Sequence, residues 1–495
     1  MSDSHASGFV EGLRAGIGRS GPVSVARDAV NPAMIRHWCD AMEDDNPLYT
    51  DPDAAARSLH GGLVAPPAML MAWSMRGLER PTRAVADPES SDLDSTNPDS
   101  TNPDSTNPDS ANPASADPGS NVYRALDAAG FTSVVATNSE HEYLRYLRLG
   151  DELHSSQVLE DVSEEKKTAL GVGHFVTTRT EYRDQAGETV GRMLFRILKF
   201  KPGTGRGATA EGAGPGAAGE RPQRPKPGVS RDTAFFWQGL EVGELRIQQC
   251  TACSKLHHPP MVRCPECGSY ELGWIQASGR GTVYSHVEPV HPRFAAFEPP
   301  YVVGLVELEE GTRLLTNIVD VDPEAVRVGM PLELVIRRQN SEIPLPLFRP
   351  IRPPRRETTL ARDAVQVGDE LAPCPIPITA TLIVATAIAS RDYQDVHHDR
   401  ELAMERGSPD IFMNILTTTG LCARYVTDWA GPEALVRKLS IQLGVPNYPH
   451  DTMTMTGSVL SSEGGRVEVG VRGYNRMGNH VTGRVELELP AGDGG

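Results

Sequence analysis

The sequence predicts an α+β protein in which two related halves flank a small β-rich domain. Three observations predict this fold class. A short polar motif occurs twice with the same spacing, two Cys-x2-Cys pairs lie in the middle of the chain, and a long apolar helical segment near the end is followed by strand-like runs. The duplication and the cysteine pairs are independent signals, and together they indicate at least three folded units.

Composition limits the possible functions. At roughly 150 residues per domain, the 495 residues are enough for about three domains. The 65 acidic and 48 basic residues give a net charge of −17, which opposes nucleic-acid binding. The chain has neither a signal-peptide pattern in its first ten residues nor the run of roughly 20 apolar residues that a membrane span needs. We therefore expect a cytoplasmic protein that binds neither nucleic acid nor a membrane.

The repeated motif aligns without a gap. Its first copy comprises residues 44–49 (DDNPLY), Asp51 and Ala55, and its second comprises residues 392–397 (DYQDVH), Asp399 and Ala403. His397 of the second copy corresponds to Tyr49 of the first, so only the second copy keeps an imidazole. A second match, between residues 182–192 and 474–484, predicts a strand, a glycine turn and a strand in both halves. Each half should begin with a loop and a helix and end in antiparallel strands.

Two breaker segments set the domain boundaries. Residues 84–121 repeat the unit Asp-Ser-Thr-Asn-Pro and consist mainly of Ser, Asp, Asn and Pro, which predicts a disordered insertion. Residues 203–231 are rich in Gly, Ala and Pro and predict a linker. The resulting folded blocks span residues 8–202, 232–350 and 356–490.

The third block predicts a helix wrapped by a sheet. Residues 410–430 are apolar on most faces and follow Pro409, which predicts a buried helix. Strand-like runs follow at residues 438–444, 452–460, 466–472 and 481–489. This is the hot-dog architecture, and the duplication predicts a pseudo-symmetric double hot dog. In the first half, the helical segment at residues 68–76 runs into the insertion, so its central helix should be short or missing.

The middle block begins with a metal-binding pattern. Cys250, Cys253, Cys264 and Cys267 form two close pairs, which can place four thiolates around one Zn²⁺ ion. A site with four protein ligands is closed, so we expect one structural zinc rather than a catalytic one. His257 and His258 lie near enough to be ligands but are not needed. The remaining cysteines, Cys39, Cys374 and Cys422, are interpreted as packing residues.

Short strands after the cysteines predict a small Greek-key barrel of the OB type, at residues 281–290, 301–308, 313–319 and 331–336. Such barrels often bind single-stranded nucleic acid, but residues 235–338 hold 13 acidic and 9 basic side chains. With residues 236–240 (FWQGL) and 299–303 (PPYVV), the block resembles the zinc-ribbon/OB proteins that accompany thiolases in acyl-CoA metabolism. The resemblance implies that it docks a thiolase-like aldolase.

Asp392 and His397 are the candidate catalytic residues, because a carboxylate and an imidazole on one loop can act on the same water molecule. Their motif resembles Asp-x-Asn-Pro-x-His-x5-Ala of the MaoC-like (R)-specific enoyl-CoA hydratases, with Gln394 and Asp395 in place of Asn-Pro. The resemblance implies that the pair directs water to C3 of a trans-2-enoyl-CoA, with coenzyme A as part of the substrate. It also implies that the backbone N–H groups of Met413 and Asn414 form the oxyanion hole.

The first half lacks both the catalytic imidazole and the backbone oxyanion donor. Tyr49 replaces the imidazole, and the gapless alignment places Pro66, which has no N–H to donate, opposite Asn414. The whole chain resembles a fusion of the two subunits of the actinobacterial steroid side-chain hydratases, which implies a bulky steroid acyl-CoA, a role in steroid degradation and a homo-oligomer. Two alternatives remain open: a hot-dog acyl-CoA thioesterase, and a non-catalytic acyl-CoA-binding scaffold for a thiolase-like partner.

Overall fold

The computed structural model describes residues 3–78, 118–204, 222–297, 299–321, 323–338 and 341–490. Most of the segment expected to be disordered, and most of the expected linker, lie outside these ranges. Helix α6 (Pro118–Ala128) nevertheless begins inside the last residues of that segment, so the insertion ends earlier than residue 121. Within the described residues, no helix is long and apolar enough to cross a membrane.

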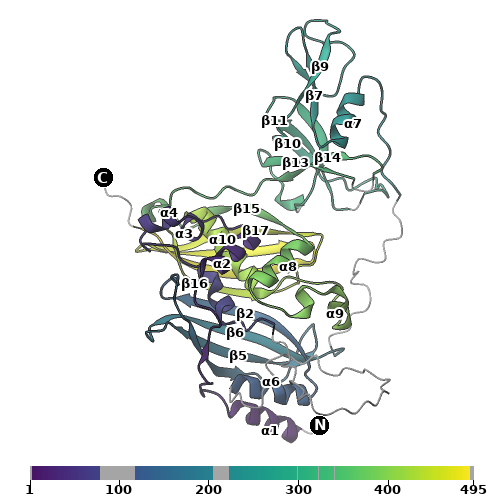
Figure 1. The fold of residues 1–495 in the computed structure, drawn as a ribbon. Helices are drawn as coiled ribbons and strands as arrows, with labels where there is room; N and C mark the ends of the chain where they lie inside the picture. Colours follow the sequence, from purple (N-terminus) through teal and green to yellow (C-terminus); the bar gives the residue numbers. More distant parts are fainter. Residues whose placement is uncertain are drawn as a thin grey trace, which may run out of the picture.

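The two halves share one continuous sheet, above which the middle domain stands apart (Figure 1). The main strands of the first half are β2 (Ser133–Tyr143), β3 (His154–Val162), β5 (Val172–Arg183) and β6 (Thr189–Lys201). Those of the second half are β15 (Glu370–Ile378), β16 (Leu435–Leu443), β17 (Asp451–Glu463), β18 (Arg466–Asn475) and β19 (Gly478–Glu488). The sheet order is β1-β3-β5-β6-β2-β16-β19-β18-β17-β15, with β1 (Ser24–Val25) at one end and β4 (Lys166–Lys167) paired to β5. The antiparallel pairing of β2 with β16 therefore joins the halves.

The helices confirm the internal repeat. In the first half they are α1 (Asp3–Arg14), α2 (Pro32–Met42), α3 (Pro47–Thr50), α4 (Pro52–Arg57), η1 (Pro67–Met69), α5 (Leu70–Ser74) and α6. In the second they are η4 (Arg362–Ala364), α8 (Ala380–Ala389), η5 (Asp395–His397), α9 (Arg400–Glu405) and α10 (Ile415–Ala430). Asp51 and Asp399 cap α4 and α9 through their side chains, and Ala55 and Ala403 are both fully buried. The motif thus builds the same local structure twice.

The central helices differ as the sequence predicts. Helix α10 runs for 16 residues, whereas η1 and α5 of the first half form only a short helical segment. At the middle of α10, a Cβ on Gly420 would lie 2.9 Å from the Trp38 ring and 3.1 Å from Met42. A glycine is needed there because α2 of the first half packs directly against α10.

Helix α10 begins five residues later than predicted. Asn414 is its N-cap, and the preceding residues are held in extended conformation: the N–H of Phe412 donates to Val396, and that of Met413 to Asn447. Tertiary hydrogen bonds therefore override the helical signal after Pro409. Strand β15 was not predicted, because Pro373, Pro375 and Pro377 interrupt it; it lies at the end of the sheet, where proline is tolerated.

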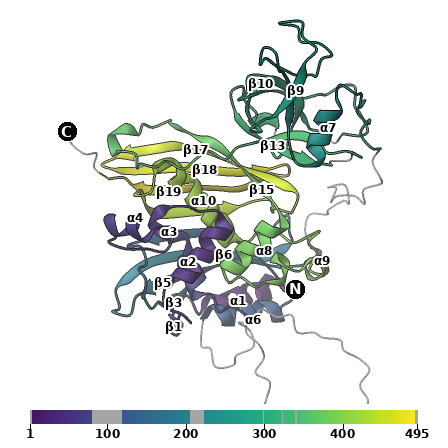
Figure 2. The ribbon, with the colours of Figure 1, turned by 45° about the horizontal axis from the view of Figure 1, so that its top comes forward.

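The middle domain combines a helix, a three-stranded sheet and a closed barrel. Its first part contains α7 (Ala234–Glu241), β7 (Arg246–Cys250), β8 (Leu256–His257) and β9 (Leu272–Gln276). The barrel, in the order β10-β11-β12-β14-β13, contains β10 (Arg280–Val287), β11 (Val302–Leu308), β12 (Arg313–Ile318), η3 (Pro323–Ala325), β13 (Pro331–Arg337) and β14 (Leu345–Pro350). The fifth strand, β14, was not predicted. Figure 2 shows the domain set apart from the joined sheet.

Candidate active site

Asp392 and His397 come together as the sequence predicts. Asp392 follows α8, and its N–H donates to the carbonyl of Ala387, which ties the loop to the helix end. His397 closes the short helix η5, and its Nε2 lies 3.5 Å from Asp392 Oδ2. Both side chains are only 6% exposed. The arrangement presents a carboxylate and an imidazole nitrogen to the same point.

The backbone fixes the orientation of the imidazole. His397 Nδ1 lies 2.7 Å from the carbonyl oxygen of Phe412, which can only accept a hydrogen bond. Nδ1 must therefore carry the proton, and in the neutral ring Nε2 keeps a lone pair beside Asp392. The Phe412 ring also meets the imidazole edge to face, with centroids 5.1 Å apart. A base oriented in this way can take a proton from a water molecule held between it and Asp392.

Asn414 has a side-chain role that the sequence reasoning missed. Its Nδ2 donates to Asp392 Oδ2 at 3.0 Å and to Ser390 Oγ at 3.0 Å. Its Oδ1 caps α10 by accepting hydrogen bonds from the N–H and hydroxyl of Thr417. One amide therefore couples the start of the central helix to the Asp392 carboxylate. The N-cap signal before an apolar helix was present in the sequence, but its link to Asp392 is a tertiary contact.

The predicted oxyanion donors differ in availability. The Met413 N–H donates to the carbonyl of Asn447 at 3.1 Å, so it is engaged within the protein. For the Asn414 N–H, no acceptor is found in the part of the chain that the structure describes. The latter group lies at the N-terminus of α10, where the helix dipole favours negative charge. Of the two predicted donors, the Asn414 N–H is therefore available to an acceptor at this helix end, and the Met413 N–H is engaged within the protein.

In the first half, the corresponding carboxylate is bound by arginine. Asp44 Oδ1 lies 2.6 Å from Arg355 Nη2, and the same nitrogen lies 2.5 Å from Asp428 Oδ1 at the end of α10. Burial opposes the charge on Arg355, but the carboxylates of Asp44 and Asp428 outweigh it and raise the pKa of Arg355. Asp428 is also paired with Arg352 at 2.8 Å. We call Arg352, Arg355, Asp44 and Asp428 the arginine clasp; it anchors the segment after the barrel between the two halves.

Two further residues distinguish the first site. Tyr49 is buried, and burial raises its pKa well above the usual value, so its hydroxyl stays protonated. Pro66 precedes η1 at the position that corresponds to Asn414. The first copy therefore places a bound carboxylate, a neutral phenol and a proline where the second places Asp392, His397 and Asn414.

The clasp predicts a large loss of stability on removal of Arg355. Arg355→Ala leaves Asp44 and Asp428 buried with fewer cationic partners, and should lower the free energy of unfolding by about 3–5 kcal/mol, measured by urea denaturation. Arg400→Ala is the matched control, because Arg400 is 68% exposed and contacts Asp410 at 3.4 Å; it should cost about 0–1 kcal/mol. Equal, small losses in both variants would contradict the clasp.

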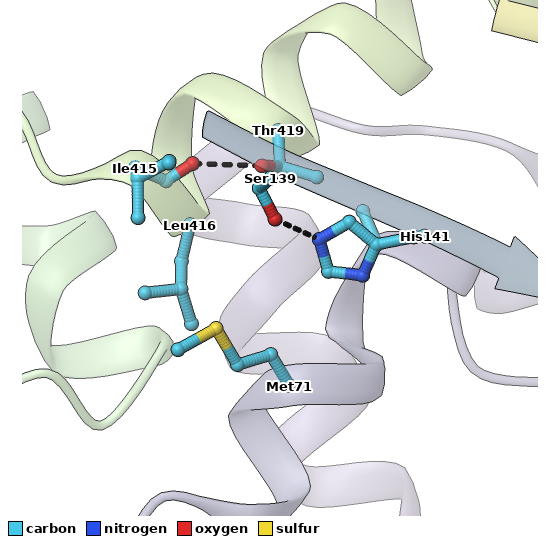
Figure 3. Close-up of a pocket in the computed structure, with 7 residues that line it drawn as sticks. Met71, Ser139, His141, Ile415, Leu416 and Thr419 are labelled. Atoms are coloured by element: carbon cyan, nitrogen blue, oxygen red, sulfur yellow. Dashed lines mark hydrogen bonds between the residues drawn. The ribbon is translucent and has the colours of Figure 1, made fainter. Parts of the chain in front are cut away.

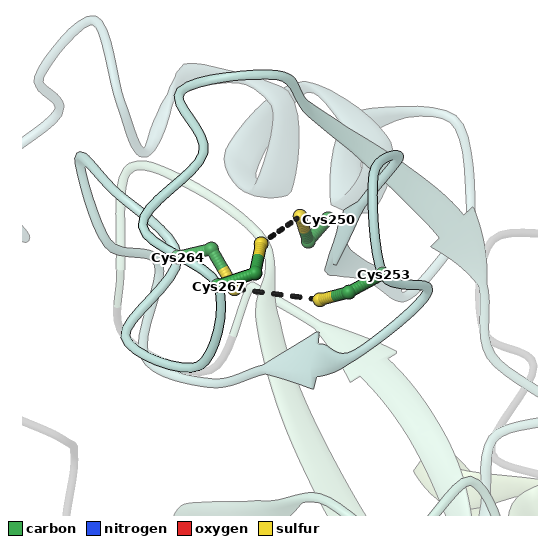
Figure 4. A group of neighbouring side chains, drawn as sticks. All are labelled: Cys250, Cys253, Cys264 and Cys267. Atoms are coloured by element: carbon green, nitrogen blue, oxygen red, sulfur yellow. Dashed lines mark hydrogen bonds between the residues drawn. The ribbon is translucent and has the colours of Figure 1, made fainter.

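The four predicted metal ligands form one cluster (Figure 4). Cys250 Sγ lies 3.6 Å from Cys267 Sγ, and Cys253 Sγ lies 3.7 Å from Cys264 Sγ. All four ligand atoms lie within 4.8 Å of one another, which fits the tetrahedral thiolate set of a zinc ribbon. His257 Nε2 lies 3.3 Å from Cys264 Sγ, where it can donate to the sulfur rather than replace it.

A narrow hollow lies between the halves at the start of α10 (Figure 3). It contains about 180 Å³ of space, part of it open to solvent, and no water-sized sphere fits into it in this conformation. Its lining residues are Ala68, Met71, Ser139, His141, Ile415, Leu416 and Thr419. Because Ile415 directly follows Asn414, the hollow adjoins the candidate active site. None of these residues was singled out from the sequence as a site residue.

The fold and the acid/base loop together define a hot-dog hydratase, and comparisons with known proteins agree. A "FAS1-like, dehydratase domain region" model matches residues 17–94 and 113–193. Models described as "ChsH2, rubredoxin-like zinc ribbon domain" and "ChsH2, C-terminal OB-fold domain" match residues 237–273 and 274–337. A solved MaoC-like dehydratase, 16% identical, superposes with a TM-score of 0.50 and covers 97% of this chain and 100% of its own, which supports the fold.

Curated relatives identify the family more closely. A "Probable enoyl-CoA hydratase alpha subunit" of Thermomonospora curvata is 40% identical over 69% of this chain and 96% of its own. The alpha and beta subunits of the Mycobacterium tuberculosis 3-oxo-4,17-pregnadiene-20-carboxyl-CoA hydratase are 39% and 56% identical, over 62% and 22% of this chain and 86% and 84% of their own. The chain belongs to the family of these MaoC-like enoyl-CoA hydratases, and one polypeptide matches relatives of both subunits.

Proposed function

We propose that the second half hydrates a trans-2-enoyl-CoA with a bulky, steroid-like acyl group, and that Asp392 and His397 activate the water. The observation that carries the proposal is the buried pair itself: Asp392 Oδ2 and the lone-pair nitrogen of His397 lie 3.5 Å apart and face one another. The carboxylate is oriented by Asn414 and the imidazole by the Phe412 carbonyl.

In the proposed reaction, water lies between Asp392 and His397 Nε2. One of these two groups takes a proton from the water as its oxygen bonds to C3 of the enoyl thioester. The electron pair of the C2–C3 double bond moves toward the thioester oxygen, where the Asn414 N–H and the α10 dipole stabilise the negative charge. The proton then passes to C2. The product is a 3-hydroxyacyl-CoA, and the thioester is unchanged.

The size of the acyl group follows from the asymmetry of the two halves. The first half has only η1 and α5 where the second has the full α10. In the described residues, this shorter segment leaves α10 facing small or flexible side chains such as Ala68 and Met71 across the hollow. Flexible methionines can yield to a bulky apolar group. The substrate named for the M. tuberculosis relatives, 3-oxo-4,17-pregnadiene-20-carboxyl-CoA, is of this size class.

The catalytic proposal predicts that hydration depends on the second copy alone. Asp392→Asn or His397→Ala should lower kcat for hydration of 3-oxo-4,17-pregnadiene-20-carboxyl-CoA and of trans-2-butenoyl-CoA by roughly 10²-fold or more, because general acid/base help is lost. Loss of enoyl absorbance measures the rate, and circular dichroism checks folding.

Matched changes in the first copy are the control. Tyr49→His should not create a second site, because Pro66 still lacks an N–H to donate. Asp44→Asn should affect stability through the arginine clasp and leave the turnover of the folded fraction near the wild-type value. The active half is misassigned if His397→Ala keeps wild-type hydration or if Asp44→Asn abolishes hydration without loss of stability. Release of free CoA by the wild type would instead indicate a thioesterase.

The cysteine cluster should hold one structural zinc through Cys250, Cys253, Cys264 and Cys267. Metal analysis of the purified chain is expected to give about one zinc per chain, and Cys264→Ser should remove it and unfold the middle domain while hydration of trans-2-butenoyl-CoA survives. His257→Ala should retain the metal, because four thiolates complete the coordination. A natively folded, metal-free protein would refute the site.

We also propose that the zinc-ribbon/OB domain docks a thiolase-like aldolase. Two observations support this role. The domain stands apart from the joined sheet (Figures 1 and 2), which leaves most of its surface open to a partner. A Methanocaldococcus jannaschii relative, 40% identical over 18% of this chain and 65% of its own, is named a "DUF35 domain-containing scaffold protein". A retro-aldol enzyme could act on the 3-hydroxyacyl product.

Docking can be tested by co-expression. A thiolase-like aldolase should co-purify with the full chain and fail to co-purify when residues 232–350 are deleted, while the deleted protein still hydrates trans-2-butenoyl-CoA. The net negative charge of the domain predicts no nucleic-acid binding. Tight, salt-sensitive binding of single-stranded DNA by this domain, with no retention of the aldolase, would overturn the assignment.

A further inference from the structure

One wall of the hollow beside α10 is polar, and most of the remaining lining is apolar. Ser139 and His141 lie two residues apart on β2, so both side chains point to the same side of the sheet. Opposite them are Ile415 and Leu416 from the first turn of α10, and Met71 from α5 (Figure 3). The polar pair and Met71 come from the first half of the chain, and Ile415 and Leu416 come from the second.

Ser139 and His141 share one hydrogen bond, and the buried Nδ1 of His141 has no partner in the described part of the chain. Ser139 Oγ lies 2.6 Å from His141 Nε2, and both residues are 2% exposed. The Ser139 hydroxyl has no other hydrogen-bond partner in the described part of the chain. His141 Nδ1 is buried with none there either. Leaving such a group unpaired is costly, so native proteins rarely do it without a reason.

These hydrogen-bond partners determine which nitrogen of His141 carries the proton. The hydroxyl proton of Ser139 has one acceptor within reach, His141 Nε2. Burial lowers the pKa of His141 to about 4, so the ring is neutral and carries a single proton. If Ser139 donates to Nε2, that proton is on Nδ1. Nδ1–H is then a fixed donor without an acceptor, in an apolar cavity next to the site of hydration.

We propose that His141 Nδ1–H donates a hydrogen bond to a ring carbonyl of the acyl group, with Ser139 as its positioning residue. This makes His141 a specificity determinant for apolar, polycyclic enoyl-CoAs that carry a keto group. The inference rests on the proposed hydratase function and specifies its substrate class. A carbonyl oxygen accepts and cannot donate, so it matches the free N–H.

The hollow extends along α10 away from Asn414. The hollow is lined by Ile415, Leu416 and Thr419, and Thr419 lies five residues along α10 from Asn414. At 1.5 Å per residue this is roughly 7–8 Å along the helix axis. An acyl group held at Asn414 by its thioester can therefore place a rigid ring system against this face of α10. Entry requires Met71 and Leu416 to move, because the hollow is closed to a water-sized sphere.

The test compares two steroid enoyl-CoAs that differ in one group. The first is 3-oxo-4,17-pregnadiene-20-carboxyl-CoA. The second has CH₂ in place of the ketone carbonyl at C3 of the steroid ring, which is distinct from C3 of the enoyl thioester. Wild-type kcat/KM for hydration should favour the ketone by about tenfold or more, equivalent to about 1.4 kcal/mol. His141→Leu should abolish this preference by lowering kcat/KM for the ketone alone. His141→Gln, which restores an N–H donor, should recover part of it.

The controls separate this inference from the hydratase proposal. All variants should hydrate trans-2-butenoyl-CoA within about twofold of the wild type, because its short chain does not reach the hollow. His60→Leu removes another imidazole of the first half with an unpartnered Nε2, outside the hollow, and should keep the preference. If His141→Leu does not fold, Ser139→Ala carries the test: it frees the tautomer and should reduce the preference.

The contradicting outcomes are distinct. The role of His141 is overturned if the protein hydrates trans-2-butenoyl-CoA but His141→Leu keeps the ketone preference, or if the wild type shows no such preference. Either result leaves the hydratase proposal intact. Failure of the wild type to hydrate any of the three substrates overturns the hydratase proposal itself. A preference reversed toward a 3-hydroxy analogue would show that Nδ1 is an acceptor and refute the tautomer assigned here.

Discussion

The pairing of β2 with β16 is the contact on which the rest of the structure depends. It is antiparallel and runs from Glu142 opposite Lys438 to Asn138 opposite Gln442, with an ion pair of 2.8 Å between Lys438 and Glu140. Through it, the strands of the two halves become one sheet, against which α10 packs. The same strand, β2, carries Ser139 and His141 into the hollow. Without this pairing, the hollow beside α10 would lack its polar wall.

Fusion of two copies allows each to specialise. In the second copy, the carboxylate of Asp392 stays near an imidazole and is held by an amide, so it remains able to act on water. In the first copy, the corresponding Asp44 forms an ion pair with Arg355, which lies in the segment after the barrel. Burying that carboxylate costs free energy, which the cation offsets, and the outcome is a structural clasp between domains. One loop geometry thus holds the proposed catalytic pair in one half and an interdomain ion pair in the other.

Most of the architecture could be predicted because it is encoded locally. The repeat, the cysteine spacing, the strand alternation after α10 and the shortened helix of the first half are visible in contiguous residues. The errors arise where distant contacts decide the outcome. The start of α10 was misplaced because Met413 bonds to Asn447, and β15 was missed because edge position, unknown from sequence, is what permits its prolines.

The residues of the candidate site also fall into two groups: those that the sequence predicts and those that only tertiary contacts bring together. Asp392, His397 and the four cysteines follow from spacing, and the structure brings each set together. Three features join residues that are far apart in sequence or on different elements: the hydrogen bond from the Asn414 amide to Asp392, the Arg355 clasp and the Ser139–His141 pair facing α10. A single sequence carries no signal for such contacts.

The proposed addition of water to the enoyl thioester is tested most directly by following the oxygen atom of water into the product. The wild-type protein is incubated with 3-oxo-4,17-pregnadiene-20-carboxyl-CoA in water enriched in ¹⁸O, and the products are analysed by mass spectrometry. Activation of water by Asp392 and His397 predicts an intact CoA thioester with one ¹⁸O atom in a new hydroxyl group at C3 of the acyl chain. Free CoA together with a labelled carboxylate, or unlabelled starting thioester alone, would contradict it.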